Sequence, residues 1–328
     1  MPSIIALTCS DLDDKVKMKY YIDSCKRNNV EYDIIGINKK FTWLGRMKWI
    51  KEYLETSNHD IVCFTDAYDV FYLDNLNTIK DKFLSFECDI VWSAEKMYSF
   101  QLNEDKSFFD NLYSSGNEYK YINAGTFMGY RYALLKLFTD IIDISLKDNT
   151  FINELYSINF FVDTIRGADQ TWISHHLAKY WQNYNIKLDI ECHIFYVPCD
   201  DWHYIEGCVD KDMKNIKTGK TPSVIHVCNK SVYEHILQEL YSWKYPDSFL
   251  KHVANKEYTW GDYNTVRFLD HGVMNAFGKG WYLYIDDHTI KACFGGNRIH
   301  MITFNEDYSE YVSVREGDND MVKGTIVI

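Results

Sequence analysis

Short apolar runs alternate with amphipathic stretches along the first two-thirds of the chain. Apolar residues recur every three or four positions from Trp43 to Leu54, and again from Ile79 to Phe86, which marks one face of an amphipathic helix in each stretch. This β-α-β-α-β order predicts a mostly parallel sheet covered by helices on both faces. The predicted strands are, in chain order, residues 3–9, 32–37, 61–65, 89–93 and 223–228.

The pattern changes near the C-terminus, where apolar and polar residues alternate from about residue 265 onward. Two such runs, 281–285 and 290–294, flank an acidic turn at residues 286–288, which is typical of a β-hairpin. Further strands are predicted at residues 298–304, 310–315 and 321–328. We therefore expect two domains, an α/β domain over residues 1–250 and a small antiparallel β module over residues 260–328.

Composition excludes several classes of protein. Of the 328 residues, 46% are hydrophobic and 25% are charged, which excludes wholesale disorder. The net charge is −12, and because nucleic-acid affinity comes mainly from basic side chains, we expect neither a nucleic-acid nor a membrane partner. No apolar run approaches the ~18 residues of a spanning helix. The N-terminus also lacks the basic segment of a signal peptide, so we expect a cytoplasmic protein.

The nine cysteines include no C-x-x-C pair, and we expect reduced, mostly buried thiols. One local cluster contains Cys192, His193, Cys199, His203 and Cys208. Its spacing matches no common zinc site, so we expect no zinc there.

The most informative motif follows the third predicted strand and reads FTDAYDV over residues 64–70. Its carboxylates, Asp66 and Asp69, are three residues apart at a strand end, where α/β sheets bind their ligands. Two carboxylates suit Mn²⁺ or Mg²⁺, and such an ion neutralises charge on a departing diphosphate. The alternative is an exposed acidic turn.

Several segments in the same order resemble the glycosyltransferase domain of collagen lysyl hydroxylases. They are LT (7–8), WLGRMKWIK (43–51), FTDAYDV (64–70), SAE (93–95), YINAGTFMG (121–129), ADQ (168–170) and IH (225–226). The resemblance covers residues 3–245. It implies a GT-A fold, Mn²⁺ as cofactor, UDP-glucose as donor, and glucose transfer to galactosyl-hydroxylysine of collagen or a collagen-like protein.

By position, the resemblance also implies three groups of site residues. The metal ligands would be Asp66, Asp69 and His226. The donor-binding residues would be Thr8, Arg46, Tyr68, Asp66, Gln170 and Lys230. The catalytic residues would be Asp169, Glu95 and Asn123, with Asn123 bonded to donor-sugar hydroxyls.

Each of these roles has a simpler alternative. A lone His226 is often structural, and Tyr68, which would stack on uracil, is otherwise a half-buried core tyrosine. Arg46 stands where the family usually has Lys and would meet phosphate with a planar fork; otherwise it is a solvated helix charge. Asp169 precedes a helical stretch and is also a candidate N-cap.

The sequence departs from the family at several positions. Ala124 replaces a serine, and the family's poly-Asp run is reduced to Asp169 alone. The aromatic residue expected to gate the site would be Tyr98 or Phe100. After the histidine, residues 227–229 read VCN where the family has Gly-Asn-Gly.

Other motifs are rejected. Residues 214–221 end like a phosphate-binding loop but begin with Lys214 where glycine is required. His175 and His176 lie in a helical stretch and are expected to have a surface or core role. The tail has no convincing iron triad of the hydroxylase half, so we expect a transferase alone.

We favour a retaining, Mn²⁺-dependent glucosyltransferase. One alternative is a UDP-galactose transferase acting on hydroxylysine, and another is an inactive sugar-binding protein on the same fold. The β module, with Trp281, Tyr282 and Tyr284, would bind glycan or peptide, cover a homodimer interface, or cap the fold. The missing signal segment would suit a large DNA virus with its own collagen-like proteins, and hence the cytoplasm of an infected host cell.

Overall fold

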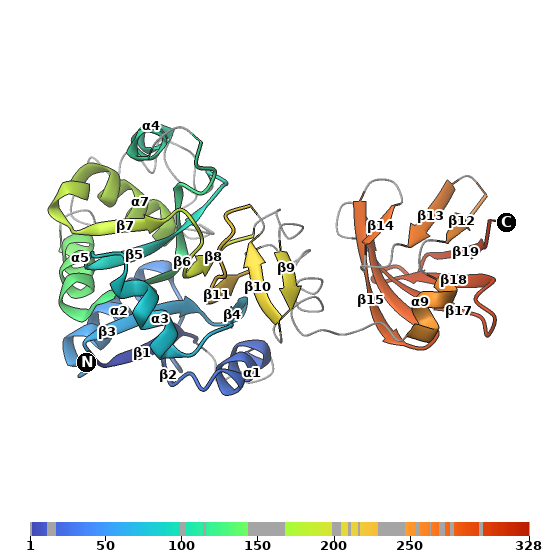
Figure 1. Ribbon diagram of the computed structural model, residues 1–328, viewed down its shortest axis with the longest axis horizontal. Coiled ribbons are helices and arrows are strands. Elements are labelled where there is room, and N and C mark those ends of the chain that lie inside the picture. Colours follow the sequence, from blue (N-terminus) through green and yellow to red (C-terminus); the bar gives the residue numbers. More distant parts are fainter. Residues whose placement is uncertain are drawn as a thin grey trace. The chain divides into compact units, whose positions relative to one another are not determined.

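The structure is a computed structural model with two compact units, Met1–Glu206 with Met213–Cys228 and Gly207–Asp212 with Asn229–Ile328 (Figure 1). We call them the N-terminal and C-terminal units. The residues that the structure describes are 2–11, 18–98, 103–113, 116–143, 168–198, 205–208, 211–215, 217–228, 247–253, 256–262, 264–268, 273–275, 279–294 and 298–327.

A six-stranded sheet in the order β2-β1-β3-β6-β5-β7 forms the centre of the N-terminal unit. The strand β6 pairs antiparallel with both of its neighbours, while the other three pairings are parallel. Five strands therefore run one way, and their carboxyl ends meet at one edge of the sheet. The strands are β1 (Ile4–Cys9), β2 (Tyr32–Ile35), β3 (Ile61–Asp66), β5 (Ile90–Glu95), β6 (Tyr121–Tyr130) and β7 (Ile186–Asp189).

Helices cover both faces of this sheet (Figure 1). Adjacent residues of a strand point to opposite faces. On one face, Cys63 packs with Tyr21 of α1 and Phe83 of α3. On the other face, the Phe64 ring stacks on Phe127, which contacts α5. The helices are α1 (Lys19–Arg27), α2 (Trp43–Thr56), α3 (Leu76–Leu84), α4 (Asn103–Leu112), α5 (Arg131–Asp143), α7 (Ala168–Tyr180) and the 3₁₀ turn η2 (Trp181–Asn183).

Two smaller sheets contain strands from residues 70–72 and 195–226. One has the order β4-β11-β8, in which β11 is antiparallel to β4 and parallel to β8. The other is the pair β9 and β10. Their strands are β4 (Val70–Tyr72), β8 (Phe195–Tyr196), β11 (Val224–His226), β9 (Ile205–Cys208) and β10 (Lys211–Asn215). The first sheet matters for function because it carries β11 to the end of β3.

The C-terminal unit is one antiparallel sheet of eight strands in sequence order, preceded by α9 (Asp247–Val253). Its strands are β12 (Glu257–Trp260), β13 (Asn264–Phe268), β14 (Val273–Asn275), β15 (Lys279–Asp286), β16 (Thr289–Phe294), β17 (Arg298–Phe304), β18 (Glu310–Arg315) and β19 (Met321–Thr325). The first and last strands also contact each other, since Gly261 N–H donates to the Lys323 carbonyl and Tyr258 bridges Ile326. The sheet therefore closes into a cylinder.

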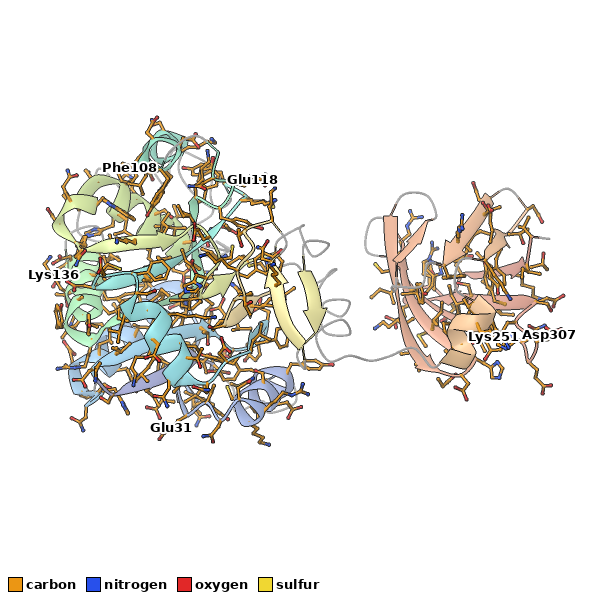
Figure 2. The ribbon with its side chains drawn as sticks, in the orientation of Figure 1. Glu31, Phe108, Glu118, Lys136, Lys251 and Asp307 are labelled. Carbon is orange, nitrogen blue, oxygen red and sulfur yellow. The ribbon has the colours of Figure 1, made fainter. Side chains whose placement is uncertain are left out.

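Aromatic side chains fill this cylinder. Tyr258, Phe268, Phe304 and Tyr311 form one buried cluster with Phe249 of α9. The buried hydroxyls have partners, because Tyr258 donates to the Tyr308 carbonyl at 2.9 Å and Tyr311 donates to the Thr259 carbonyl at 2.8 Å. Charged side chains such as Asp307 here, and Lys136 on α5 of the N-terminal unit, lie at the surface (Figure 2).

Closure of the cylinder depends on Gly324. A Cβ at this position would lie 2.2 Å from the Thr259 carbonyl oxygen and 2.3 Å from the Tyr311 ring. We predict that Gly324→Ala destabilises the C-terminal unit by roughly 3 kcal/mol, because neither backbone nor a buried ring can yield cheaply. Thermal unfolding of Gly324→Ala measures the effect. The control is Lys323→Ala, at an exposed position on the same strand. Equal melting temperatures would contradict it.

The fold class is confirmed as α/β with a mostly parallel central sheet and a C-terminal antiparallel β module. Two strands, 298–304 and 310–315, have the predicted bounds, and residues 286–288 form the predicted hairpin turn. Strands were expected from about residue 265 onward. The strand β12 lies before this point, and β13 includes it. Tyr282 is a core residue rather than an exposed sugar platform. The side chains of Trp281 and Tyr284 lie outside the described residues.

Seven cysteines are free thiols in the described part of the chain, and all except Cys228 are buried. This agrees with the expectation of reduced, mostly buried thiols. Cys199 and His203 of the rejected zinc cluster lie outside the described residues.

Candidate active site

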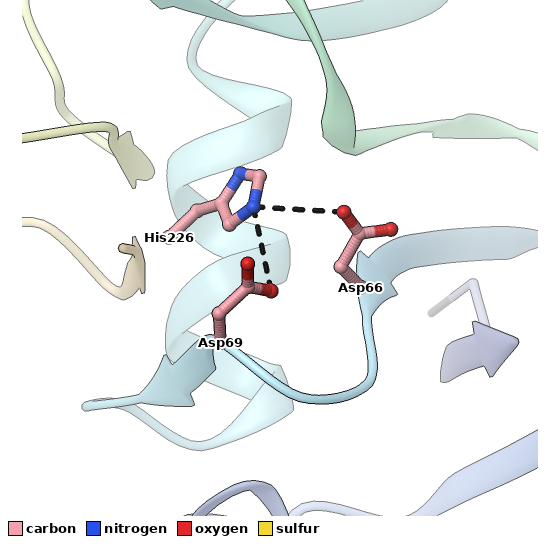
Figure 3. Close-up of side chains that lie close together, drawn as sticks. All are labelled: Asp66, Asp69 and His226. Atoms are coloured by element: carbon pink, nitrogen blue, oxygen red, sulfur yellow. Dashed lines mark ion pairs between the residues drawn. The ribbon is translucent and has the colours of Figure 1, made fainter. Parts of the chain in front are cut away.

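Three potential metal ligands meet at the carboxyl end of β3 (Figure 3). Asp66 is the last residue of β3, and Asp69 lies in the short turn before β4. His226 ends β11, which pairs with β4 so that His226 is opposite Val70. The His226 Nε2 atom lies 3.5 Å from Asp66 Oδ2 and 3.5 Å from Asp69 Oδ1. Strand pairing thus brings together residues that are far apart in the chain.

The donor set fits a hard divalent cation. One ligand atom from each residue lies within 4.8 Å of the others, and this is the only such group of metal-binding side chains among the described residues. Two carboxylates and one imidazole form a ligand set that suits Mn²⁺. Softer metals are instead selected by thiolate ligands. Burial alone would lower the pKa of His226, but Asp69 and Asp66 outweigh it and hold this pKa above the ordinary 6.5. The two carboxylates therefore stabilise positive charge at this group.

Gly125 leaves room for this centre. A Cβ on Gly125 would lie 2.1 Å from His226 Cε1 and 2.7 Å from Asp66 Oδ2. Real Cβ atoms do not approach that closely, so any side chain at residue 125 would displace His226 or Asp66. Glycine is needed here for space.

Gly125 belongs to a bulge in β6. The pairing of β5 with β6 shifts between Trp92 and Ala94, so residues 123–126 of β6 face only Ser93. The Trp92 indole donates to the Asn123 carbonyl at 2.8 Å, and the Ser93 hydroxyl lies 3.0 Å from the same oxygen. Bulges commonly direct side chains into active sites, and this one turns Asn123 toward His226.

Arg46 is buried and joined to two carboxylates. Its guanidinium donates to Asp66 Oδ1 at 2.5 Å and to Asp169 Oδ2, and it lies over the rings of Trp43 and Phe64. Because only 5% of the residue is exposed, the alternative of a solvated helix charge is wrong. One oxygen of Asp66 thus faces Arg46 and the other faces His226.

The candidate catalytic residues Glu95, Asn123 and Asp169 are all buried. Asp169 lies in the first turn of α7 and accepts from the N–H of Gln170 at 2.9 Å. Gln170 accepts from Ala124 N–H at 2.9 Å and donates to Glu95 at 2.7 Å. The structure therefore brings these residues into one hydrogen-bonded group with Asp66 and His226.

The remaining predicted site residues do not belong to this hydrogen-bonded group. Tyr68 is 36% exposed and its hydroxyl lies 2.7 Å from the Ser10 hydroxyl. Thr8 is fully buried and donates to the Thr65 carbonyl at 2.8 Å. Tyr98 packs edge-on against Tyr121, while Phe100 and Lys230 lie outside the described residues.

The helix α7, which carries Asp169 and Gln170, is fixed to α5 by His176. The His176 ring lies 2.7 Å from the Tyr184 hydroxyl, which donates to Asp140 of α5. Both His175 and His176 are buried, as a core role requires. Burial lowers the pKa of His176 to about 4.

This pKa predicts a pH-dependent stability. A lowered folded-state pKa means that the unfolded chain takes up the proton first, so stability present above pH 6.5 is lost as the pH falls toward 4. We expect the N-terminal unit to lose about 2 kcal/mol of unfolding free energy between pH 7 and pH 5. Denaturant unfolding of wild type and His176→Gln, which keeps a donor without a titrating ring, measures it. Equal losses in both proteins would contradict the assignment.

Sequence reasoning missed two features of this site. One is the need for space at Gly125, and the signal that could have found it is the NAG turn inside an apolar run. The exposed Cys228 was treated as a departure from the family, yet its sulfur lies 3.5 Å from the His226 ring nitrogens.

An α/β fold with an Asp-Asp-His group at the carboxyl end of a strand is compatible with a glycosyltransferase that uses a divalent metal. The chain belongs to the PLOD GT domain family, whose sequence model matches residues 3–241. The resemblance recognised from the motifs is therefore confirmed.

Two curated relatives are similar to part of the chain. Procollagen-lysine,2-oxoglutarate 5-dioxygenase of Drosophila melanogaster is 24% identical over 225 residues, which are 63% of this chain and 28% of the relative. An uncharacterized protein of Acanthamoeba polyphaga mimivirus is 26% identical over 203 residues, 58% of this chain and 38% of the relative. The chain thus matches well under half the length of either relative.

Among solved structures, the chain is similar to a glycosyltransferase involved in the glycosylation of the major capsid of PBCV-1. The TM-score is 0.34 at 11% identity, over 70% of this chain and 96% of that one. A score this low supports no inference about the present chain.

No described helix is long and apolar enough to cross a membrane.

Proposed function

We propose that this chain transfers glucose from UDP-glucose to galactosyl-hydroxylysine of a collagen-like protein, with Mn²⁺ held by Asp66, Asp69 and His226. The observation that carries the proposal is the convergence of these three side chains at the end of β3 in a chain of the PLOD GT domain family. The acceptor class is supported by the relative whose name contains procollagen-lysine.

The chain's own residues have distinct parts in this reaction. Tyr68, exposed at the end of β3, would stack on the uracil ring. When bound, the metal would draw off the negative charge that develops on the departing diphosphate. Arg46 keeps Asp66 turned so that its second oxygen faces His226.

We assign Asp169 to the sugar side of the reaction. Asp169 pairs with Nη2 of Arg46 and Asp66 pairs with Nη1, so the guanidinium partly neutralises both carboxylates. We propose that the acceptor hydroxyl attacks from the face of the leaving group and passes its proton to the departing phosphate oxygen, so that configuration is retained. Asp169 is then the candidate to stabilise positive charge on the sugar carbon.

The test is UDP release by the full chain from UDP-glucose and from UDP-galactose, each with and without Mn²⁺ and galactosyl-hydroxylysine. We expect release from UDP-glucose that requires both metal and acceptor. Turnover of UDP-galactose with unmodified hydroxylysine would replace this proposal with the galactosyltransferase alternative. Absence of release from either donor, with sugar binding intact, would indicate a sugar-binding protein on this fold.

A further inference from the structure

The two ring nitrogens of His226 have different surroundings. Its Nε2 faces the carboxylates of Asp66 and Asp69. Its Nδ1 lies 2.9 Å from Oδ1 of Asn123, a residue only 4% exposed. A metal-binding histidine needs its second nitrogen held by a partner that decides which nitrogen keeps the proton.

The amide of Asn123 has one orientation that satisfies its neighbours. Gly125 N–H donates to Oδ1 at 3.0 Å, while Nδ2 lies 3.4 Å from Glu95 Oε2. Turning the amide over would set its NH₂ group against the Gly125 N–H and its oxygen against the Glu95 carboxylate. Oδ1 is therefore an acceptor toward His226, and Nδ1 must be the nitrogen that carries hydrogen.

Glu95 is in turn held from its other side. Gln170 Nε2 donates to Glu95 Oε1 at 2.7 Å, and Gln170 Oε1 accepts from Ala124 N–H at 2.9 Å. The chain of hydrogen bonds thus begins and ends on backbone N–H groups of the same β6 bulge, at Ala124 and Gly125. Glu95 is 2% exposed and Gln170 is 7% exposed, so water competes little for these bonds.

We propose that Asn123 is a positioning residue that keeps the proton on Nδ1 of His226 and leaves the Nε2 lone pair for the metal, with Glu95 and Gln170 fixing the Asn123 amide. This inference rests on the metal site of the proposed function and deepens it. It gives Asn123 and Glu95 a role through His226, in place of contact with the reacting sugar.

The test compares variants by Mn²⁺ affinity, measured calorimetrically on the full chain without donor or acceptor. Asn123→Leu keeps the branching at Cγ but removes the acceptor, and we expect affinity to fall on the order of 10- to 100-fold. The matched control is the double variant Asn123→Asp with Glu95→Gln. It conserves the net charge and keeps an acceptor for Nδ1–H of His226. The new amide at position 95 would donate to the new carboxylate at position 123, and its oxygen would still accept from Gln170. We expect its affinity to stay within about threefold of wild type.

A second readout reports the tautomer directly. In ¹⁵N NMR of the Zn²⁺-loaded chain, Nδ1–H with Nε2 bound to metal is expected for wild type and for the double variant. Loss of that signature is expected for Asn123→Leu. If this variant does not fold, the double variant alone decides, since a proton on Nε2 or a large loss of affinity there would overturn the inference.

The outcomes separate this inference from the proposed function. If the wild-type chain binds Mn²⁺ and Asn123→Leu binds it equally well, the positioning role is wrong. The proposal of a metal-dependent transferase would be unaffected. A wild-type chain that binds no Mn²⁺ would overturn the metal assignment, and this inference with it.

Discussion

Gly125→Ala is expected to abolish Mn²⁺ binding and metal-dependent turnover while the N-terminal unit stays folded. The added methyl group would lie 2.1 Å from His226 Cε1 and 2.7 Å from Asp66 Oδ2, so at least one of these ligands must move. A ligand displaced by about 1 Å no longer meets the cation at a bonding distance, and we expect the metal affinity to fall more than about 100-fold. Calorimetric titration with Mn²⁺ and the UDP-release assay measure both effects.

The matched control is Gly129→Ala, which adds the same methyl group to the same strand. There the Cβ would lie 2.7 Å from the Asp89 carbonyl oxygen and 3.1 Å from Ile90, away from the metal ligands. This variant should lose stability, yet its folded fraction should bind Mn²⁺ as wild type does. If the two variants lose metal binding equally, the effect of Gly125→Ala is general destabilisation and the spatial argument is wrong.

Asp69→Asn is expected to lower kcat/KM for UDP-glucose on the order of 10³-fold, equivalent to about 4 kcal/mol of transition-state stabilisation. The substitution keeps the shape of the side chain and removes the charge that faces His226 at 3.5 Å. Because Asp69 is partly exposed, the folded structure should change little. Activity measured over a range of Mn²⁺ concentrations should show that excess metal restores only part of the loss.

Asp66→Asn should reduce activity at least as much, for a further reason. Asp66 also accepts from Arg46, so its neutral form leaves a buried guanidinium with Asp169 as its one charged partner among the described residues. We therefore expect a loss of stability in addition to the loss of turnover. Asp81→Asn, an exposed carboxylate on α3, is the control for both variants. Full activity in Asp69→Asn would refute the metal assignment.

The fold follows from local patterns to a considerable extent. The apolar spacing from Trp43 to Leu54 predicts α2, and Met47, Ile50 and Leu54 are indeed buried on it. The apolar runs predict β1, β3 and β5 to within about two residues at each end. These predictions succeed because helix and strand periodicity depend on which face of a short segment is buried, and that is written in consecutive residues.

The direction of β6 and the closure of the C-terminal cylinder were not predicted. Nothing in residues 121–130 records that both neighbouring strands run the other way. Closure requires Gly324 to meet Thr259 and Tyr311 across strands that are distant in sequence. Strand pairing is a long-range property that a local pattern does not specify.

The candidate site shows the same division. The FTDAYDV motif at the end of a strand was enough to predict two carboxylates at one edge of the sheet, and the family motifs added His226 and Asp169. Their chemical partners came only from the fold: the pairing of β11 with β4 delivers His226, the β6 bulge supplies Asn123 and the space at Gly125, and α2 buries Arg46 between two carboxylates. A side chain's type is encoded at its own position, but its distance to another side chain depends on every element packed between them.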